Sequence, residues 1–96
     1  MKIKVIEPQK VIWSSITRET TIEVDGKKIT VRSSEDDNGT EIWAGFDDDE
    51  LVETYRLKDP ELEKLVNEIG LNMDYGMFDV KGDEFDSSEI IDDEIA

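Results

Sequence analysis

The chain has 96 residues, enough for one domain with a modest core but too few for a roomy enclosed cavity. It has no cysteine and no histidine, which excludes disulfides, thiolate metal sites and the side chain most used for acid–base catalysis near neutral pH. Its formal net charge of −15 opposes direct binding of nucleic acid or anionic lipid. We therefore expect a cationic protein as partner, no membrane association, no cofactor and no enzymatic activity.

The charge is distributed unevenly along the chain. Residues 1–34 carry seven basic and four acidic side chains, and residues 35–96 carry the other four of the 11 basic and the other 22 of the 26 acidic ones. Such a concentration of like charge destabilises a compact state unless a partner or a cation offsets it. The asymmetry favours an interaction surface over the alternative, an acidic surface that only confers solubility, because solubility needs less charge.

The N-terminal third predicts extended structure. Residues 2–6 alternate lysine with isoleucine and valine, which predicts a strand, and Pro8 is expected to end it. Residues 10–18 predict a second extended segment, in which Ser14 and Ser15 would form a bulge.

The dipeptide Asp25-Gly26 is the strongest local signal, because both residues tolerate the positive φ angles of a type I′ turn. It predicts a hairpin of residues 20–24 and 27–32. The register places apolar residues opposite each other on one face, Ile22 with Ile29. On the other face it places opposite charges across the strands, Glu23 with Lys28 and Glu19 with Arg32.

A second turn dipeptide, Asn38-Gly39, predicts a hairpin that joins residues 27–34 to residues 41–46. Three apolar residues of the later strand then share the face of Val31, namely Ile42, Ala44 and Phe46. Trp43 points to the opposite face, where it is either an exposed contact residue or covered by a later segment.

The sequence period becomes helical after residue 46. Asp47 and Glu50 have capping-box spacing, which predicts a short helix from near Asp48. Asp59-Pro60 predicts a second helix, with a buried stripe of Leu62, Leu65, Val66 and Ile69. Gly70 is expected to close this helix. Its solvated face is predicted to comprise Glu61, Glu63, Lys64, Asn67 and Glu68.

The pattern weakens after residue 70. Residues 73–80 predict either one further strand or an irregular segment packed on the sheet, and a last short helix is expected from Ser87. We predict a single domain over residues 1–82 and an acidic C-terminal segment over residues 83–96, partly ordered or helical. The predicted fold class is α+β: an antiparallel sheet of four to five strands, a meander with two tight hairpins, with one or two α-helices packed on one face.

The acidic residues fall into groups at a hairpin tip, at a predicted helix start and in the C-terminal segment. Duplex DNA presents one negative charge per roughly 1.7 Å of its axis, and carboxylates fixed on turns and helix starts can imitate such an array. Taken singly, each group is more typical of a solvated surface, and only the whole set favours mimicry. The predicted partner-binding residues are Glu35, Asp36, Asp37, Glu41, Trp43, Asp47, Asp48, Asp49, Glu50, Asp83, Glu84 and Asp86.

In charge and length the chain resembles the small acidic inhibitors that phages and plasmids use against restriction or CRISPR nucleases, and the immunity proteins that block toxin nucleases. The resemblance rests on no motif, so it assigns no site residue. It implies an inhibitor that acts in the cytoplasm, of the producing cell or of a host, by blocking the cationic nucleic-acid-binding surface of a nuclease or a DNA- or RNA-binding complex.

Two other functions compete with this hypothesis. One is a structural or adaptor protein with an acidic solubilising surface, and the other is a weak divalent-cation-binding module. Residues 79–89 superficially resemble an EF-hand loop, but Lys81 takes the third position and Glu84 the sixth, where the sharp turn needs glycine. We therefore predict no metal site.

Overall fold

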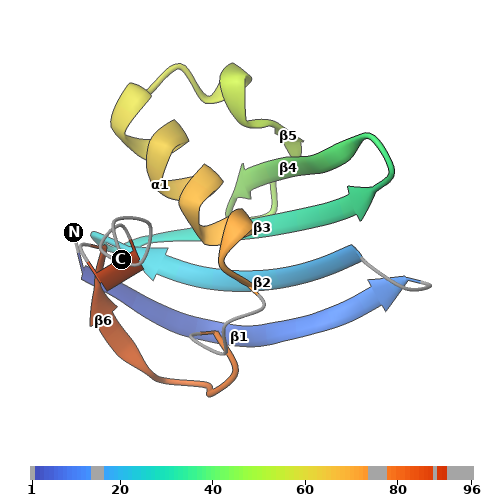
Figure 1. Cartoon of the computed structure of the whole chain (residues 1–96). Helices are drawn as coiled ribbons and strands as arrows, with labels where there is room; N and C mark the ends of the chain where they lie inside the picture. The colour runs from blue at the N-terminus through green and yellow to red at the C-terminus, as the bar shows by residue number, and fades with distance from the viewer. Residues whose placement is uncertain (1, 14–16, 74–77, 88, 91–96) are drawn as a thin grey trace.

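Six antiparallel strands form one sheet, and one α-helix crosses a face of it in the part of the chain that the structure describes (Figure 1). The computed structural model describes residues 2–13, 17–73, 78–87 and 89–90. The elements are β1 (Lys2–Trp13), β2 (Thr17–Val24), β3 (Lys27–Asp36), β4 (Gly39–Phe46), β5 (Val52–Glu53), the 3₁₀ helix η1 (Thr54–Leu57), α1 (Pro60–Leu71) and β6 (Glu84–Asp86). The sheet order is β5-β4-β3-β2-β1-β6. The α+β class is confirmed. The sheet has more strands than the four to five predicted, because β5 and β6, of two and three residues, are too short to show an alternating sequence pattern.

The hairpin of β2 and β3 forms in the predicted register. Asp25 and Gly26 take φ angles of 51° and 80°, as a type I′ turn requires. The predicted cross-strand pairs are present, Ile22 with Ile29, Glu23 with Lys28 and Glu19 with Arg32. Both isoleucines are buried in the core. This hairpin is the central unit of the sheet.

The hairpin of β3 and β4 forms in a different register from the predicted one. Asp36 pairs with Gly39, so Asp37 and Asn38 occupy the turn and the positive φ angle, 122°, falls at Gly39. The pairing of β3 with β4 is thereby shifted by two residues from the predicted one. Because side chains alternate between faces with a period of two, every side chain stays on its predicted face. Ala44 therefore still shares the face of Val31, which it now lies opposite, and Trp43 still points the other way.

The first strand does not end at Pro8, as the sequence predicted. It continues to Trp13, and the pairing with β2 shifts register between Val5 and Glu7 and again between Glu7 and Lys10. A proline cannot donate to a ladder, and Pro8 lies in an irregular stretch of β1 beyond Lys2–Lys4, where β6 pairs, so it is accommodated there. The predicted second segment is therefore split between the end of β1 and the start of β2, while Ser14 and Ser15 lie outside the described residues.

The helix predicted from near Asp48 is absent from the described chain. Asp47 donates its N–H to the Lys28 carbonyl oxygen (2.9 Å), so it extends the β3–β4 ladder and does not cap a helix. Its φ of 50° then reverses the chain into a loop, which leads to β5 and η1. Lys58, at φ 59°, ends η1.

Helix α1 begins as predicted, because the Asp59 carboxylate accepts a hydrogen bond from the Leu62 N–H (3.2 Å). The four residues of its predicted apolar stripe are all buried. Gly70 does not close the helix: it lies inside it, where an added Cβ would be 2.7 Å from Ile42 Cδ1. Glu68 is buried and not solvated as predicted.

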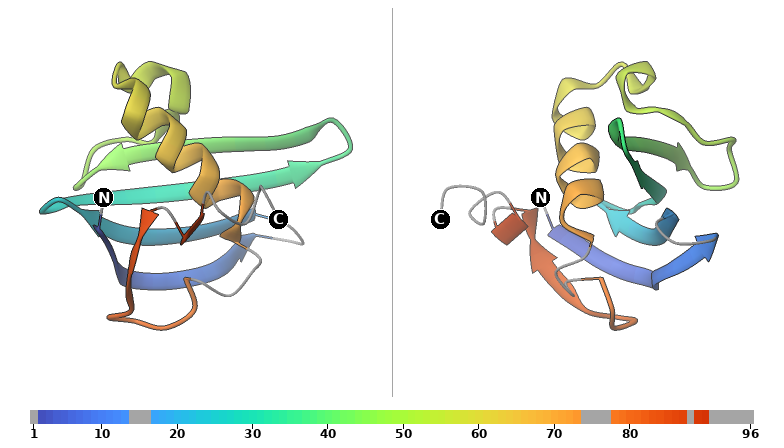
Figure 2. Two further views of the ribbon diagram at one scale, coloured as in Figure 1. Left: turned by 60° about the vertical axis from the view of Figure 1, so that its left-hand side comes forward. Right: turned by 45° about the vertical axis from the view of Figure 1, so that its right-hand side comes forward.

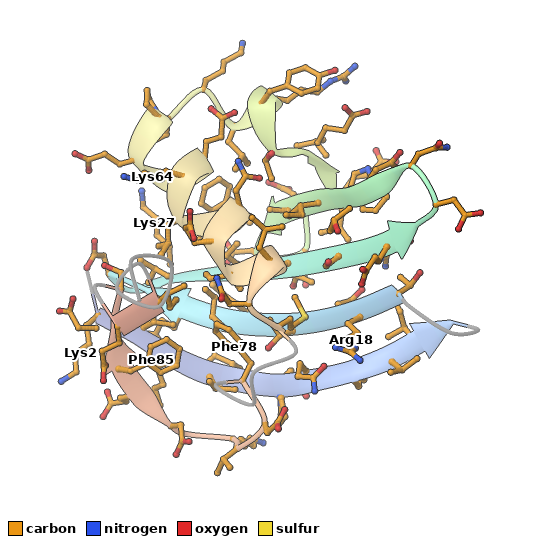
Figure 3. All side chains as sticks on the ribbon, viewed as in Figure 1. Lys2, Arg18, Lys27, Lys64, Phe78 and Phe85 are labelled. Atoms are coloured by element: carbon orange, nitrogen blue, oxygen red, sulfur yellow. The ribbon has the colours of Figure 1, made fainter. Side chains whose placement is uncertain are left out.

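The C-terminal residues that the structure describes complete the core. Phe78 is fully buried outside any strand, consistent with the irregular segment, and its ring meets that of Phe85 of β6 edge to face at 5.4 Å (Figure 3). β6 pairs with Lys2, Ile3 and Lys4 of β1, and Ile90 is also buried. Residues 74–77 and 91–96, which carry part of the predicted strand and helix, lie outside the described part.

The sheet has two unlike faces. α1 packs on one of them, and the loop between β4 and β5 passes on the opposite side (Figure 2). We call this opposite face, which carries Glu19, Arg32 and Trp43, the open face. Within the described residues, no helix is long and apolar enough to cross a membrane.

Candidate functional site

The basic side chains of the N-terminal strands face acidic ones across the open face. One row runs through four strands from Glu84 to Lys4, Glu23 and Lys28. A second row places Glu19 between Lys10 and Arg32, and Arg32 Nη2 lies 2.8 Å from Glu19 Oε2. Opposite charges paired across a ladder contribute about 0.2–1 kcal/mol each. Much of the positive charge of β1–β3 is therefore balanced within the sheet.

Residues 33–55 contain nine acidic side chains and neither lysine nor arginine. The structure places this stretch at one edge of the sheet, as the end of β3, all of β4, the following loop, β5 and the start of η1. We call it the acidic edge. Lys2 lies on β1, on the far side of β2 and β3 from β4 (Figure 3), whereas Arg18 of β2 pairs with Ser33 at the border of this edge. The charge asymmetry of the sequence is thus also an asymmetry across the sheet.

Trp43 lies midway along the acidic edge. It is half-buried on the open face, between Arg32 of β3 and Glu53 of β5. A hollow of about 310 Å³ beside it is also lined by Thr17, Ser34 and Leu51. Trp43 is thus neither covered by a helix nor fully exposed. Its environment is intermediate between the two predicted alternatives.

The loop after β4 is held against the open face at Gly45. A Cβ added to Gly45 would lie 3.0 Å from the Asp49 carbonyl oxygen and 3.1 Å from that of Glu50, so only glycine lets the loop backbone approach so closely. The Asp49 N–H also donates to the Phe46 carbonyl oxygen (2.8 Å). The loop backbone is fixed in this way, while the carboxylates of residues 47–50 remain exposed.

Most of the predicted partner-binding residues share the acidic edge, but not all of them. Glu35 and Asp37 are exposed at the hairpin tip, at the opposite end of β4 from the loop; the side chain of Asp36 is not described. Eight strand residues separate the two acidic groups by about 25 Å, at roughly 3.3 Å per residue. Glu41 is exposed and lies on the same open face as the half-buried Trp43.

The remaining predicted residues lie elsewhere. Asp83, Glu84 and Asp86 are at the β6 edge, on the far side of β3, β2 and β1. They therefore cannot form one continuous surface with the acidic edge. The sequence did not indicate this separation, because it depends on β6 pairing with β1.

A second hollow, which the sequence did not predict, opens between β4 and η1. It has a volume of about 280 Å³ and is lined by Thr40, Glu41, Glu53, Thr54, Tyr55 and Asn67. Thr54 Oγ1 donates to Asn67 Oδ1 (2.9 Å), which ties η1 to α1 on its far wall. No periodicity or motif in the sequence places η1 opposite β4, so this hollow could be found only from the fold.

Arg56 lies at the rim of η1, beside the acidic edge. Its guanidinium carbon is 5.8 Å from the centre of the Tyr55 ring, within cation–π range. The pKa of Arg56 is raised from its usual value, chiefly by the hydrogen bond with the Tyr55 side chain, then by the charges of Tyr55 and Glu53. Arg56 therefore stays charged and marks the point at which the acidic edge ends.

The acidic groups do not form a metal centre within the described residues. No three histidine, cysteine, aspartate or glutamate side chains of that part lie close enough together to hold an ion. Residues 84–86, in the middle of the stretch that superficially resembles an EF-hand, are extended as β6. An extended strand cannot wrap its oxygen ligands around calcium as an EF-hand loop does.

No family model, curated protein or solved structure matches the chain. The candidate functional site is the acidic edge, with Trp43 at its middle.

Proposed function

We propose that the protein binds and blocks a cationic nucleic-acid-binding surface of another protein, and that the acidic edge makes the contact. The observation that carries the proposal is the separation of charge: residues 33–55 combine nine acids with no base, while basic residues of β1–β3 face acids across the sheet. A surface of a single sign attracts the opposite sign, and the grooves that bind nucleic acid are strongly cationic because Lys and Arg neutralise its phosphates.

The acidic edge combines two kinds of contact. Carboxylates at both ends of β4 would steer the partner by long-range attraction, and exposed contacts of this kind weaken as salt rises. Trp43 lies between them and would supply an apolar anchor, because tryptophan is enriched among the residues that dominate interface energies. The first contribution sets the association rate and the second the lifetime of the complex.

The fixed geometry of the loop favours this function over a purely solubilising surface. Residues 47–50 follow a backbone held against Gly45, so their carboxylates start from restricted positions. Preorganised groups lose less entropy on binding than mobile ones. A solubilising surface gains nothing from such restriction. The proposed role is that of an inhibitor of the anti-restriction, anti-CRISPR or nuclease-immunity kind, acting in the cytoplasm of its own cell or of a host cell.

The test is to capture partners on the immobilised full-length protein and then to elute them with two agents. We expect a nuclease or another nucleic-acid-binding protein to be released both by rising salt and, at constant salt, by short duplex DNA or RNA. Release by DNA or RNA shows that the protein and the nucleic acid compete for one surface. A captured protein that keeps its nucleic acid while bound would contradict the proposal, as would capture that is insensitive to salt.

A further inference from the structure

β5 covers only part of the outer side of β4. In the described chain the two strands pair at Trp43 and Ala44, although β4 runs over Gly39–Phe46. After Glu53 the chain leaves the line of β5 and forms η1. The first residues of β4 are therefore an exposed sheet edge, and such edges pair readily with another extended chain.

The direction of the peptide groups along β4 follows from one hydrogen bond. The Asp47 N–H donates to the Lys28 carbonyl oxygen, on the β3 side. Hydrogen-bonded and non-hydrogen-bonded pairs alternate along an antiparallel ladder, so odd-numbered residues of β4 turn their peptide groups to β3. Even-numbered residues turn theirs outward. Ala44 thereby pairs with β5, and the N–H and C=O of Thr40 face the side where β5 has already ended.

The space beside Thr40 can receive a chain. The 280 Å³ hollow lies there, between β4 on one side and η1 with Asn67 on the other. Two carboxylates border it on the open face: Glu41 of β4, and Glu53 at the end of β5, both exposed. The polar side chains of Thr54 and Asn67 form the opposite wall. The site thus offers backbone hydrogen bonds, room and negative charge together.

We infer that an extended basic segment of the partner adds to β4 as a further strand, antiparallel to it along residues 39–41 and in line with β5, beyond Thr54, which takes the place opposite Ile42. The inference rests on the proposed function, since the segment belongs to the same cationic partner. The sign of the charge selects this occupant: a second copy of the chain, with a net charge of −15, would be repelled from an acidic edge. Strand addition of this kind takes affinity from backbone pairing and specificity from alternate side chains.

The register predicts which side chain of the incoming segment is read. The residue that pairs with Glu41 points to the open face, directly opposite the Glu41 carboxylate. Glu53 lies two positions further along the line of the new strand and on the same face. A lysine or arginine at this position would lie between both carboxylates, whereas the next residue of the segment, opposite Thr40, would point toward the hollow and η1.

The test is a titration of the ¹⁵N-labelled full-length protein, followed by NMR, with a blocked six-residue peptide of alternating lysine and valine. We expect saturable shifts of the Thr40 and Glu41 amides and slower hydrogen exchange at Thr40. The matched peptide of alternating glutamate and valine should cause neither. Absence of shifts, or equal shifts at residues 83–86, would overturn the inference.

Two variants separate strand addition from general charge attraction. Thr40→Pro removes the outward N–H without changing charge, and we expect it to weaken peptide binding at least tenfold, while Thr40→Val binds normally. Equal binding by both variants would overturn the inference. If the proline variant does not fold, hydrogen exchange at Thr40 of the unmodified protein decides: strand addition predicts slower exchange with the lysine–valine peptide than without it. If the Thr40→Pro protein still captures a partner that DNA can release, strand addition is refuted while the proposed function stands.

Discussion

Two glycines, Gly45 and Gly70, allow the closest approaches around β4. Gly45 lies under the acidic loop on the open face, and Gly70 of α1 packs on Ile42 on the other face. Neither has a positive φ angle, so space and not backbone conformation requires glycine at these positions. The position of β4 between helix and loop therefore depends on the absence of two side chains.

Replacing Gly70 by alanine should destabilise the protein. The new Cβ would lie 2.7–2.9 Å from three atoms of the Ile42 side chain, and such overpacking costs about 1–3 kcal/mol. The gain in helix propensity, at most about 1 kcal/mol, offsets only part of this. Urea unfolding measures the change, with Leu71→Ala, at an exposed neighbour, as control. A Gly70→Ala protein as stable as wild type would refute the close packing.

Replacing Gly45 by alanine should displace the acidic loop. Because the new Cβ would meet two backbone carbonyl oxygens, the loop itself must move. We expect large amide shifts over residues 47–51, small ones at the hairpin tip, and weaker binding of the partner. Unchanged amide positions in the loop would show that the backbone does not lie over this glycine.

At the scale of elements, local signals predicted what they control directly. The β2–β3 hairpin and the start of α1 were correct, because turn chemistry, alternation and capping act within a few residues. The faces of Trp43 and Ala44 were also correct, since a register shift of two residues keeps each side chain on its face. The features that failed depend on distant partners: Pro8 is tolerated in an irregular stretch, and Asp47 is held by Lys28 of another strand.

The candidate site was predictable to a similar extent. The acids and Trp43 could be found from charge and alternation alone. Three other features could not be found in this way: the contact of the loop with Gly45, the hollow beside η1, and the position of Asp83 and Glu84 at another edge. Each of these follows from segments far apart in sequence that pack together, which single-sequence patterns do not encode.

The two predicted helix starts should respond differently to mutation. Asp59 caps α1, so Asp59→Ala should cost about 0.5–2 kcal/mol of stability. Asp48 lies in an exposed turn, and Asp48→Ala should change stability by less than about 0.5 kcal/mol. Thermal or urea unfolding of both variants is the measurement. Equal losses would show that residue 48 belongs to a helix after all.

At the scale of the whole molecule, the fold separates charge. The sheet places strands with paired charges at its centre and a stretch of unmixed negative charge at the β4–β5 edge. The repulsion within that stretch is a cost of folding that a cationic partner would relieve. Stability and binding should therefore respond in opposite directions when acids are neutralised.

Neutralising Asp47, Asp48 and Asp49 together with asparagine should leave the fold intact or slightly more stable. Self-repulsion falls, no core position changes, and asparagine tolerates the positive φ of residue 47. Each single replacement should do little, because exposed ion pairs contribute about 0–1 kcal/mol. The unfolding midpoint at low and high salt checks this, with the difference from wild type shrinking as salt rises. A large destabilisation at both salt concentrations would mean that these carboxylates hold the fold together.

The association rate with the captured partner tests the central claim most directly, because it compares equal charge changes at two edges. The claim predicts that neutralising residues 47–49, or residues 35–37, slows association and weakens inhibition of nucleic-acid binding. Neutralising Asp83, Glu84 and Asp86 at the β6 edge should have much smaller effects. If both acidic-edge variants inhibit normally while Trp43→Ala does not, the partner recognises an apolar patch, and the charge of the acidic edge is not the basis of binding.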